Sequence, residues 1–193
     1  IKSSAASDVY KRQYIFNLCL SQKGFTVKIA IMGFSGSGKS TLAKQLAVHY
    51  GIPLLYLDTV NFEENWLIRD REEGKNIVAD FMQNDNWVID GNYSEFCQKE
   101  RIEQADMIII LCYNRFVCMK QAFRRNFEYK GKVRESIAKG CKEKMDPEFF
   151  YWLIWKQYSK ARKTKFASIK AKYPEKTYLL KSRKELDAFL NTL

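Results

Sequence analysis

Residues 33–40, GFSGSGKS, constrain the fold of this chain more than any other segment, because they fit the pattern G-x-x-x-x-G-K-[ST] at every fixed position. The apolar run VKIAIM precedes them, and the helix-forming segment KSTLAKQLAVHY follows. Glycines allow a tight loop whose backbone N–H groups converge, and the start of the next helix adds positive potential. The sequence therefore predicts a phosphate-binding loop between a buried strand and a helix.

This loop also predicts which residues contact a nucleotide. The ε-ammonium of Lys39 is expected to reach the β- and γ-phosphates, and the Ser40 hydroxyl is expected to ligate Mg²⁺. We therefore expect ATP and Mg²⁺ as cofactors. The residues assigned to ATP binding are Gly33, Ser35, Gly36, Ser37, Gly38, Lys39, Ser40 and Thr41.

Five short apolar runs separated by helical stretches predict a parallel sheet. The runs are 27–32, 53–57, 87–90, 107–112 and 177–180, with helices expected at 39–49, 66–83, 95–104, 115–128, 147–171 and 183–191. Continuous rather than alternating apolarity suits strands that are covered on both faces. The pattern favours an α/β doubly wound sheet with right-handed crossovers. A polar, basic stretch at about 129–146 is the expected place for a mobile lid.

Two carboxylates stand where predicted strands end. Asp58 closes LLYLD, and Asp90 closes WVID directly before Gly91 and Asn92. Because the carboxyl ends of parallel strands face the ligand crevice, both are expected in the site. Asp58 would accept a proton from an attacking hydroxyl or hold Mg²⁺ through water, and a helix N-cap or a loop salt bridge is the alternative. Asp90 matches a Walker B carboxylate, which with Ser40 would position Mg²⁺, and a strand-end turn is its alternative.

Arginines supply further candidates for phosphate contacts, because a guanidinium donates two parallel hydrogen bonds and stays charged. Arg115 follows the fourth predicted strand, and Arg162 lies on the helix after the lid. For each arginine a solvated surface position is the alternative. The residues assigned to catalysis are Lys39, Asp58, Arg115, Arg124, Arg125 and Arg162, and the other arginine candidates are Arg69, Arg71, Arg101 and Arg134.

The acceptor side of the site is assigned to residues after the second and third predicted strands. These are Asp58, Trp66, Arg69, Asp90, Gly91 and Asn92, with Trp66 as a wall of the pocket. The aromatic segment 149–158 is interpreted mainly as a core-packing stripe, with base stacking as the lesser alternative. His49 is expected on the surface.

The net charge of +11 is unevenly distributed and bears on the partners of the chain. Residues 115–172 carry +12, whereas residues 27–114 carry −5. Such a basic stretch suits phosphate-rich partners, so weak DNA binding stays open. No apolar run reaches the length of a membrane span. The five cysteines form no C-x-x-C pair, so we expect reduced thiols in a cytoplasmic protein.

Residues 1–26 are expected to be a non-native leader. Residues 3–13, SSAASDVYKRQ, resemble the translation of an adapter used in preparing sequencing libraries, and 14–26 is interpreted as translated upstream sequence. A genuine N-terminal extension is the alternative. The predicted domain therefore runs from 27 to 193 as a single unit.

From Val27 onward the chain resembles the P-loop proteins called DNA topology modulation protein FlaR, which are similar to adenylate and shikimate kinases. The resemblance rests on KIAIMGFSGSGKSTLAKQLA, LYLDTVNFEENW, RDREEG, WVIDGNYS, RIEQADMIIIL, NRFVCMKQAFRR and YPEKTYLLKSRKELDAFL. It implies a P-loop NTPase fold with a five-stranded parallel sheet of order 2-3-1-4-5 and a lid after strand 4. It also implies that Asp58 binds the phosphoryl acceptor and that Arg124, Arg125 and Arg134 clamp phosphates. The segment FEENW departs from the relatives, which have Pro-Gly before the Trp.

Together, the residues and the resemblance predict an ATP-dependent kinase of the nucleoside monophosphate kinase type. It would transfer the γ-phosphate of ATP to a small nucleotide-like or hydroxylated acceptor. The alternative is a DNA-associated regulatory ATPase that affects DNA topology. The sequence leaves the acceptor and the oligomeric state open, because acceptor pockets are built from loops that diverge freely.

Overall fold

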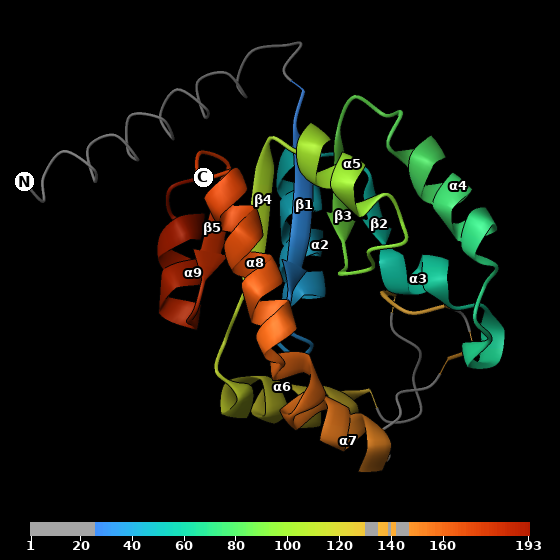
Figure 1. The fold of residues 1–193 in the computed structure, drawn as a ribbon, viewed down its shortest axis with the longest axis vertical. Helices are drawn as coiled ribbons and strands as arrows, with labels where there is room; N and C mark the ends of the chain where they lie inside the picture. The colour runs from blue at the N-terminus through green and yellow to red at the C-terminus, as the bar shows by residue number, and fades with distance from the viewer. Residues whose placement is uncertain (1–25, 130–134, 139, 142–146) are drawn as a thin grey trace, which may run out of the picture.

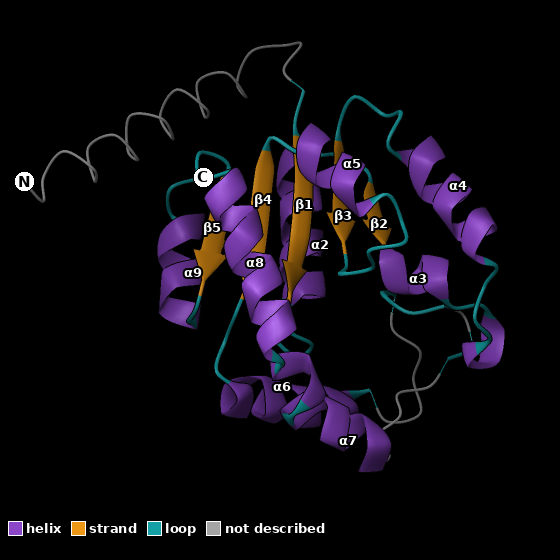
Figure 2. Cartoon of the chain, in the orientation of Figure 1, coloured by secondary structure: helices purple, strands orange, loops and turns teal. Residues whose placement is uncertain are grey.

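The computed structural model describes residues 26–129, 135–138, 140–141 and 147–193. Its strands are β1 (Lys28–Gly33), β2 (Leu54–Tyr56), β3 (Trp87–Asp90), β4 (Met107–Leu111) and β5 (Thr177–Leu180). They form one parallel sheet in the order β2-β3-β1-β4-β5 (Figure 2). The predicted α/β fold with a five-stranded parallel sheet of order 2-3-1-4-5 is confirmed.

Helices cover both faces of this sheet. They are α2 (Lys39–Tyr50), α3 (Leu57–Asn61), α4 (Arg71–Phe81), α5 (Gln98–Gln104), α6 (Arg115–Glu128), α7 (Pro147–Ile154), α8 (Lys160–Lys172) and α9 (Arg183–Leu190), with 3-10 turns η1 (Glu64–Trp66) and η2 (Lys156–Tyr158). Figure 1 shows α5 and α8 in front of the sheet and α2 behind it, while α6 and α7 lie below the carboxyl ends of the strands. Because ligands in such sheets bind outside the carboxyl ends of the strands, we expect the site at that lower edge.

The sheet is buried because its strands are apolar on both faces. All five residues of β4 and all four of β3 are buried, which explains their unbroken apolar sequence. In β1, Ile29 pairs in register with Met107 on one side and with Val88 on the other. Since β1 lies between β3 and β4, the loop that leaves it emerges where the strand order reverses, which is where ligands bind in such sheets.

Two helices and one strand have boundaries that differ from the sequence expectation. The helix expected over 147–171 is broken into α7, η2 and α8, and Ser159 caps the start of α8. The helix expected from residue 66 begins at Arg71, because the Asp70 carboxylate accepts the N–H groups of residues 72 and 73 at 3.0 Å each. The second strand ends at Tyr56, and Asp58 lies in the first turn of α3 rather than at a strand end.

The predicted leader, residues 1–26, lies outside the described residues except for Thr26. The predicted lid, 129–146, is described only at 129, 135–138 and 140–141, and Arg134 falls outside. His49 is exposed at the end of α2, as expected. Within the described part of the chain, no helix combines the length and apolarity needed to cross a membrane, and none of the four cysteines there forms a disulfide.

Candidate active site

The phosphate-binding loop leaves β1 at Gly33 and enters α2 at Lys39. Gly33, Gly36 and Gly38 have φ values of 139°, 78° and 89°, which favour glycine. A Cβ added to Gly36 would collide with the Cys118 carbonyl of α6, and one added to Gly33 would collide with the backbone of Leu111. The loop therefore follows a path that only glycine permits, pressed against the ends of two neighbouring elements.

The backbone N–H groups of the loop divide into two sets. Those of Gly33, Phe34, Ser35 and Ser37 donate to protein acceptors at 2.7–3.2 Å. Among the described residues, no acceptor takes the N–H groups of Gly36, Gly38, Lys39, Ser40 and Thr41. These five residues line the cavity at the start of α2, where the helix dipole favours negative charge. The loop thus presents a cluster of free donors that suits an anion with several oxygens.

Lys39 lies along the same loop. Its Nζ donates to the Phe34 carbonyl oxygen at 2.9 Å. Burial lowers the pKa of Lys39, and the carboxylates of Asp90 and Asp58 act in the opposite direction to a smaller extent. A polyanion in the cavity would favour the charged ammonium, so binding would reinforce the form of Lys39 that attracts phosphate.

Ser40 and Asp90 form a pair of oxygen donors beside the loop. The Ser40 hydroxyl donates to Oδ2 of Asp90 at 2.7 Å, and Asp90 is the last residue of β3. Both line the cavity. A carboxylate and a hydroxyl suit Mg²⁺, which proteins hold through one or two such oxygens together with phosphates and water. The residues present therefore fit the predicted metal.

Asp58 is held by a tyrosine that the sequence analysis missed. The Tyr93 hydroxyl donates to Oδ1 of Asp58 at 2.9 Å. Burial raises the pKa of Tyr93 far above its usual value, and the nearby Asp58 carboxylate raises it further. Tyr93 therefore keeps its proton and remains a donor to Asp58. Its position directly after Gly91-Asn92, at the end of a buried strand, was the available sequence signal.

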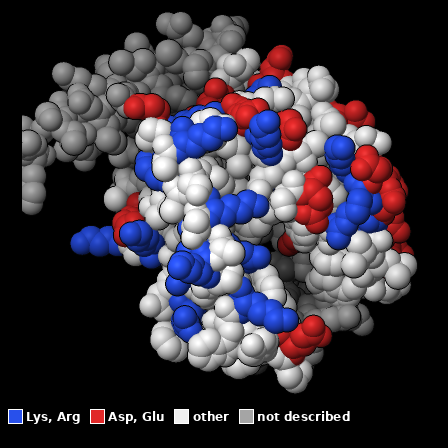
Figure 3. All heavy atoms as spheres, in the orientation of Figure 1, with Lys and Arg blue, Asp and Glu red and all other residues white. Residues whose placement is uncertain are grey.

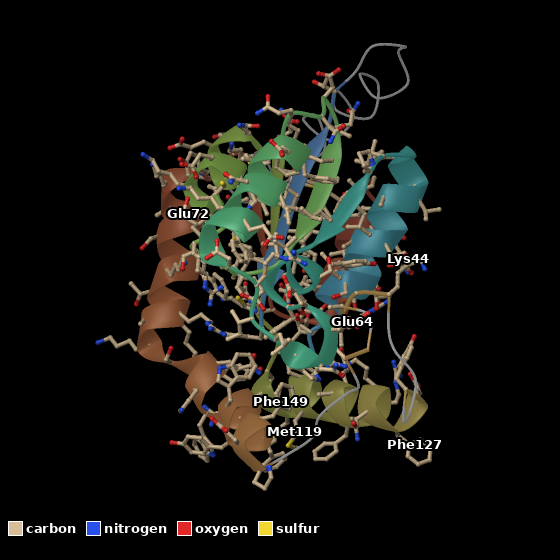
Figure 4. All side chains as sticks on the ribbon, turned by 90° about the vertical axis from the view of Figure 1, so that its right-hand side faces the viewer. Lys44, Glu64, Glu72, Met119, Phe127 and Phe149 are labelled. Carbon is tan, nitrogen blue, oxygen red and sulfur yellow. The ribbon has the colours of Figure 1, made fainter. Side chains whose placement is uncertain are left out.

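These groups line one cavity of about 960 Å³ below the carboxyl ends of the strands. Figure 4 shows Lys44 of α2 to the right of this region and Phe149 of α7 below it. Of the predicted residues, the cavity is lined by Ser35, Gly36, Gly38, Lys39, Ser40, Thr41, Asp58, Trp66, Asp90, Gly91, Asn92, Arg124, Arg125 and Arg162. Sequence positions from 35 to 162 thus meet in a single site.

Four predicted residues do not line the cavity, and two of them shape the loop from behind. Ser37 is 2% exposed, and its hydroxyl donates to the Phe34 carbonyl at 2.6 Å. Gly33 exchanges two hydrogen bonds with the side-chain amide of Asn92, at 3.0 and 2.7 Å. Asn92 was assigned to the acceptor, but its amide is directed to the loop backbone.

The other two are arginines engaged elsewhere. Arg69 donates to the Val60 carbonyl at 2.9 Å and pairs with Glu73 and Glu63. The guanidinium of Arg115 stacks over the rings of Trp155 and Tyr158, with centroid distances of 5.1 and 5.5 Å. The expectation that Arg69 and Arg115 face the substrate is therefore corrected to a role in holding loops and helices together.

Arg101, a further arginine candidate, is fully enclosed and also lies away from the cavity. Its guanidinium donates to the carbonyl oxygens of Phe96 and Tyr93 at 2.8 and 2.7 Å. Burial lowers the pKa of Arg101 to about 10. It therefore fixes the turn that carries Tyr93 and does not line the cavity.

The interpretation of 149–158 as a core-packing stripe holds only for Leu153, which is buried, and Tyr158, which packs against the core. Leu153 is the buried apolar residue of α7, while Tyr151 and Trp155 are more than half exposed. Phe149 and Trp152 line the cavity, with ring planes 22° apart and centroids at 5.9 Å. The short helix turns its rings toward the site and solvent because it lies below the sheet edge rather than against the sheet.

Two described pieces of the predicted lid region lie against the site. Glu135 pairs with Lys44 of α2, and both line the cavity. The Cys141 thiol accepts the Trp66 N–H and donates to the Glu63 carbonyl, at 3.2 Å each. Trp66 has a φ of 65°, which is unusual for a bulky residue. Cys141 thus helps to hold η1 in a strained shape that turns Trp66 into the cavity wall.

Comparison with known proteins bears on the fold. A gluconokinase from Sinorhizobium meliloti 1021 is similar, with 16% identity over 87% of this chain and 89% of that chain and a TM-score of 0.52. A shikimate kinase from Bacteroides thetaiotaomicron has 18% identity over 86% and 95% of the two chains and a TM-score of 0.47. A deoxyadenosine kinase from M. mycoides has 13% identity over 86% and 97% and a TM-score of 0.41.

The gluconokinase likeness, above a TM-score of 0.5, shows that the chain shares the fold of that protein. No protein-family model matches the chain, and no curated protein matches it in sequence. The resemblance to FlaR-type proteins therefore stays an expectation.

Proposed function

We propose that this chain is a Mg²⁺- and ATP-dependent phosphotransferase of the nucleoside monophosphate kinase type, acting on a small nucleotide-like acceptor. One observation carries the proposal: the free N–H groups of the phosphate-binding loop and the Asp58–Tyr93 pair line the same cavity. A phosphate donor and its nucleotide-like or hydroxylated acceptor would therefore meet within one cavity.

The loop side would hold the nucleotide phosphates. The five free N–H groups would donate hydrogen bonds to the phosphate oxygens, and the Lys39 ammonium would contact the β- and γ-phosphates. Ser40 and Asp90 would hold Mg²⁺, which when bound neutralises charge on the phosphate oxygens.

Asp58 would serve the acceptor. The acceptor oxygen forms a bond to the γ-phosphorus while the bond from that phosphorus to the β,γ-bridging oxygen breaks, and ADP leaves. Where the attacking oxygen belongs to a hydroxyl, its proton passes to the Asp58 carboxylate; the phosphate oxygen of a nucleoside monophosphate is already ionised, and Asp58 would then orient that acceptor. Tyr93, which donates to one oxygen of Asp58, leaves the other oxygen to accept that proton.

The walls of the cavity support a nucleotide-like acceptor. Phe62 and Trp66 meet edge to face at 5.1 Å on one side, while Phe149 and Trp152 lie on another. Such ring pairs suit a planar base. Arg162 also lines the cavity, with its guanidinium 5.5 Å from the Trp152 ring centroid. Among the described residues no carboxylate pairs with Arg162, so its charge is available to an acceptor phosphate.

A substrate panel tests this proposal. Purified protein is incubated with Mg-ATP and nucleoside monophosphates, nucleosides or hydroxylated metabolites, and acceptor-dependent ADP release is measured. Asp58→Asn is the control, because it should retain nucleotide binding but lose transfer. If Mg-ATP binds while no member of a broad panel is phosphorylated, the kinase proposal fails.

The DNA-associated alternative has less support. Figure 3 shows Lys and Arg side chains gathered along α8, which carries no acidic residue. A basic helix face is commonly only a solvated surface, and the cavity already accounts for a phosphate ligand. Retention on duplex DNA that falls steeply with salt would revive this alternative.

A further inference from the structure

The break between α7 and α8 packs against the phosphate-binding loop. The Tyr158 ring lies 4.1 Å from the Phe34 ring, and the Tyr158 hydroxyl donates to the Tyr113 carbonyl at 3.0 Å. Phe34 is 3% exposed, so this contact is part of the core. The turn η2, which carries Gln157 and Tyr158, is therefore docked on the second and third residues of the loop motif.

Gln157 makes the polar part of this contact. Its Oε1 accepts the Ser35 N–H at 2.7 Å, and its Nε2 donates to the carbonyl oxygens of Ser35 at 3.4 Å and Leu153 at 2.6 Å. The side chain is completely buried, at 0% exposure. A buried amide that satisfies both backbone groups of one residue fixes the plane of the adjoining peptides.

The position of Ser35 makes this pairing important for the loop. Ser35 is the last residue whose N–H is bound to the protein before the free donors begin at Gly36. The Ser35 carbonyl and the Gly36 N–H belong to one planar peptide unit. If that carbonyl turned, the Gly36 N–H would turn with it. The amide of Gln157 therefore keeps the first free donor aimed into the cavity.

We propose that Gln157 is a positioning residue of the phosphate-binding loop, which holds the Ser35 backbone so that the free N–H groups converge before any nucleotide arrives. This proposal rests on the proposed function only for the identity of the ligand. It also links the loop to α7, because the same amide donates to Leu153, whose neighbour Trp152 lines the cavity.

The first test needs no ligand. Hydrogen exchange of the loop amides is measured in the full chain without nucleotide, for the wild type and for Gln157→Leu, which keeps most of the volume and removes the amide. We expect the Ser35 amide to exchange at least about tenfold faster in the variant, since its acceptor is gone. Gln83→Leu, in an exposed position after α4, is the matched control and should leave loop exchange unchanged.

The second test uses Gln157→Glu and pH. The introduced carboxyl, when neutral, can accept the Ser35 N–H and donate its O–H to the Ser35 carbonyl, as the amide does. When ionised it loses the donor and places a negative charge beside the loop. The dissociation constant for Mg-ADP, divided by that of the wild type at the same pH, should therefore fall as the pH falls from about 8 to about 6. Gln83→Glu should give a flat ratio.

The outcomes separate the two proposals. If the wild type binds no Mg-ADP, the proposed function fails, while loop exchange in the unliganded protein still decides the role of Gln157. If Ser35 exchange is unchanged in Gln157→Leu, the role of Gln157 is overturned even when nucleotide binds. Should Gln157→Leu fail to fold, the pH dependence of Gln157→Glu decides, and a flat ratio overturns the proposal.

Discussion

The nucleotide side and the acceptor side of the cavity are built in different ways. The nucleotide side is made from backbone groups of one continuous segment, 33–41, whose shape glycines permit. The acceptor side is made from side chains of α3, η1, the turn after β3, and α6 to α8. A site made from backbone groups tolerates few substitutions, because they alter the path of the chain. A site made from side chains can change its specificity by substitution of single residues. Under the proposed function, phosphate binding would therefore depend on one continuous segment, whereas the choice of acceptor would depend on side chains from several elements.

The largest expected effects are losses of activity in variants of Lys39 and Asp58, and the two variants should differ in their affinity for Mg-ADP. Lys39→Met and Asp58→Asn should each lower kcat/KM by about 10²–10⁴-fold. Lys39→Met should also weaken Mg-ADP binding, because under the proposed function its charge would lie beside the phosphates, whereas Asp58→Asn should leave that affinity within about twofold. Steady-state kinetics and calorimetric titration measure both. Equal loss of Mg-ADP affinity in the two variants would contradict the division.

Backbone shape on the nucleotide side predicts a large loss of stability. Gly36→Ala should lower the free energy of unfolding by at least about 2 kcal/mol, because its Cβ would meet the Cys118 carbonyl at a positive φ. Gly51→Ala is the matched control: φ is also positive, but nothing lies within 4 Å of the added Cβ. Denaturant unfolding measures the difference. Similar losses at the two positions would show that steric contact with α6 is unimportant.

On the acceptor side, Tyr93→Phe removes one hydroxyl and keeps the ring. We expect kcat to fall by about 10–100-fold, because a hydrogen bond to a charged carboxylate is lost and Asp58 is less well oriented. Mg-ADP affinity should not change. Tyr178→Phe, in β5, keeps the same chemistry away from the cavity and should have normal activity. A Tyr93→Phe enzyme with normal kcat would contradict a role for the Tyr93 hydroxyl in orienting Asp58.

The smallest expected effect concerns η1. Cys141→Ala removes the thiol that accepts the Trp66 N–H, so Trp66 should be held less firmly in its strained conformation. We expect KM for the acceptor to rise by less than about tenfold while KM for ATP stays constant. Cys97→Ala, outside the cavity, serves as the control. A rise in KM for ATP instead would show that Cys141 supports the nucleotide side of the cavity and would contradict this prediction.

The contrast between the two sides also explains what could be predicted from sequence. The loop, its following helix, and the carboxylates Asp58 and Asp90 depend on contiguous residues, and the strand order came from the resemblance to P-loop proteins. The hydrogen bond between Ser35 and Gln157 joins residues 122 positions apart, and no local sequence pattern predicts it. Likewise, helical periodicity over 147–171 concealed a break that exists because η2 docks on the loop. Arg115 was expected to contact the ligand because it follows β4, but its guanidinium stacks over the Trp155 ring.

The placement of the four tryptophans gives the protein a built-in optical readout. Trp66 and Trp152 stand in the cavity wall, Trp87 is sealed in the core at 0% exposure, and Trp155 is 57% exposed beyond the site. A ligand that fills the cavity changes the polarity around the first two and leaves Trp87 as an internal reference. Emission from variants that retain Trp87 together with either Trp66 or Trp152 would then report separately on η1 and α7 as the site is occupied.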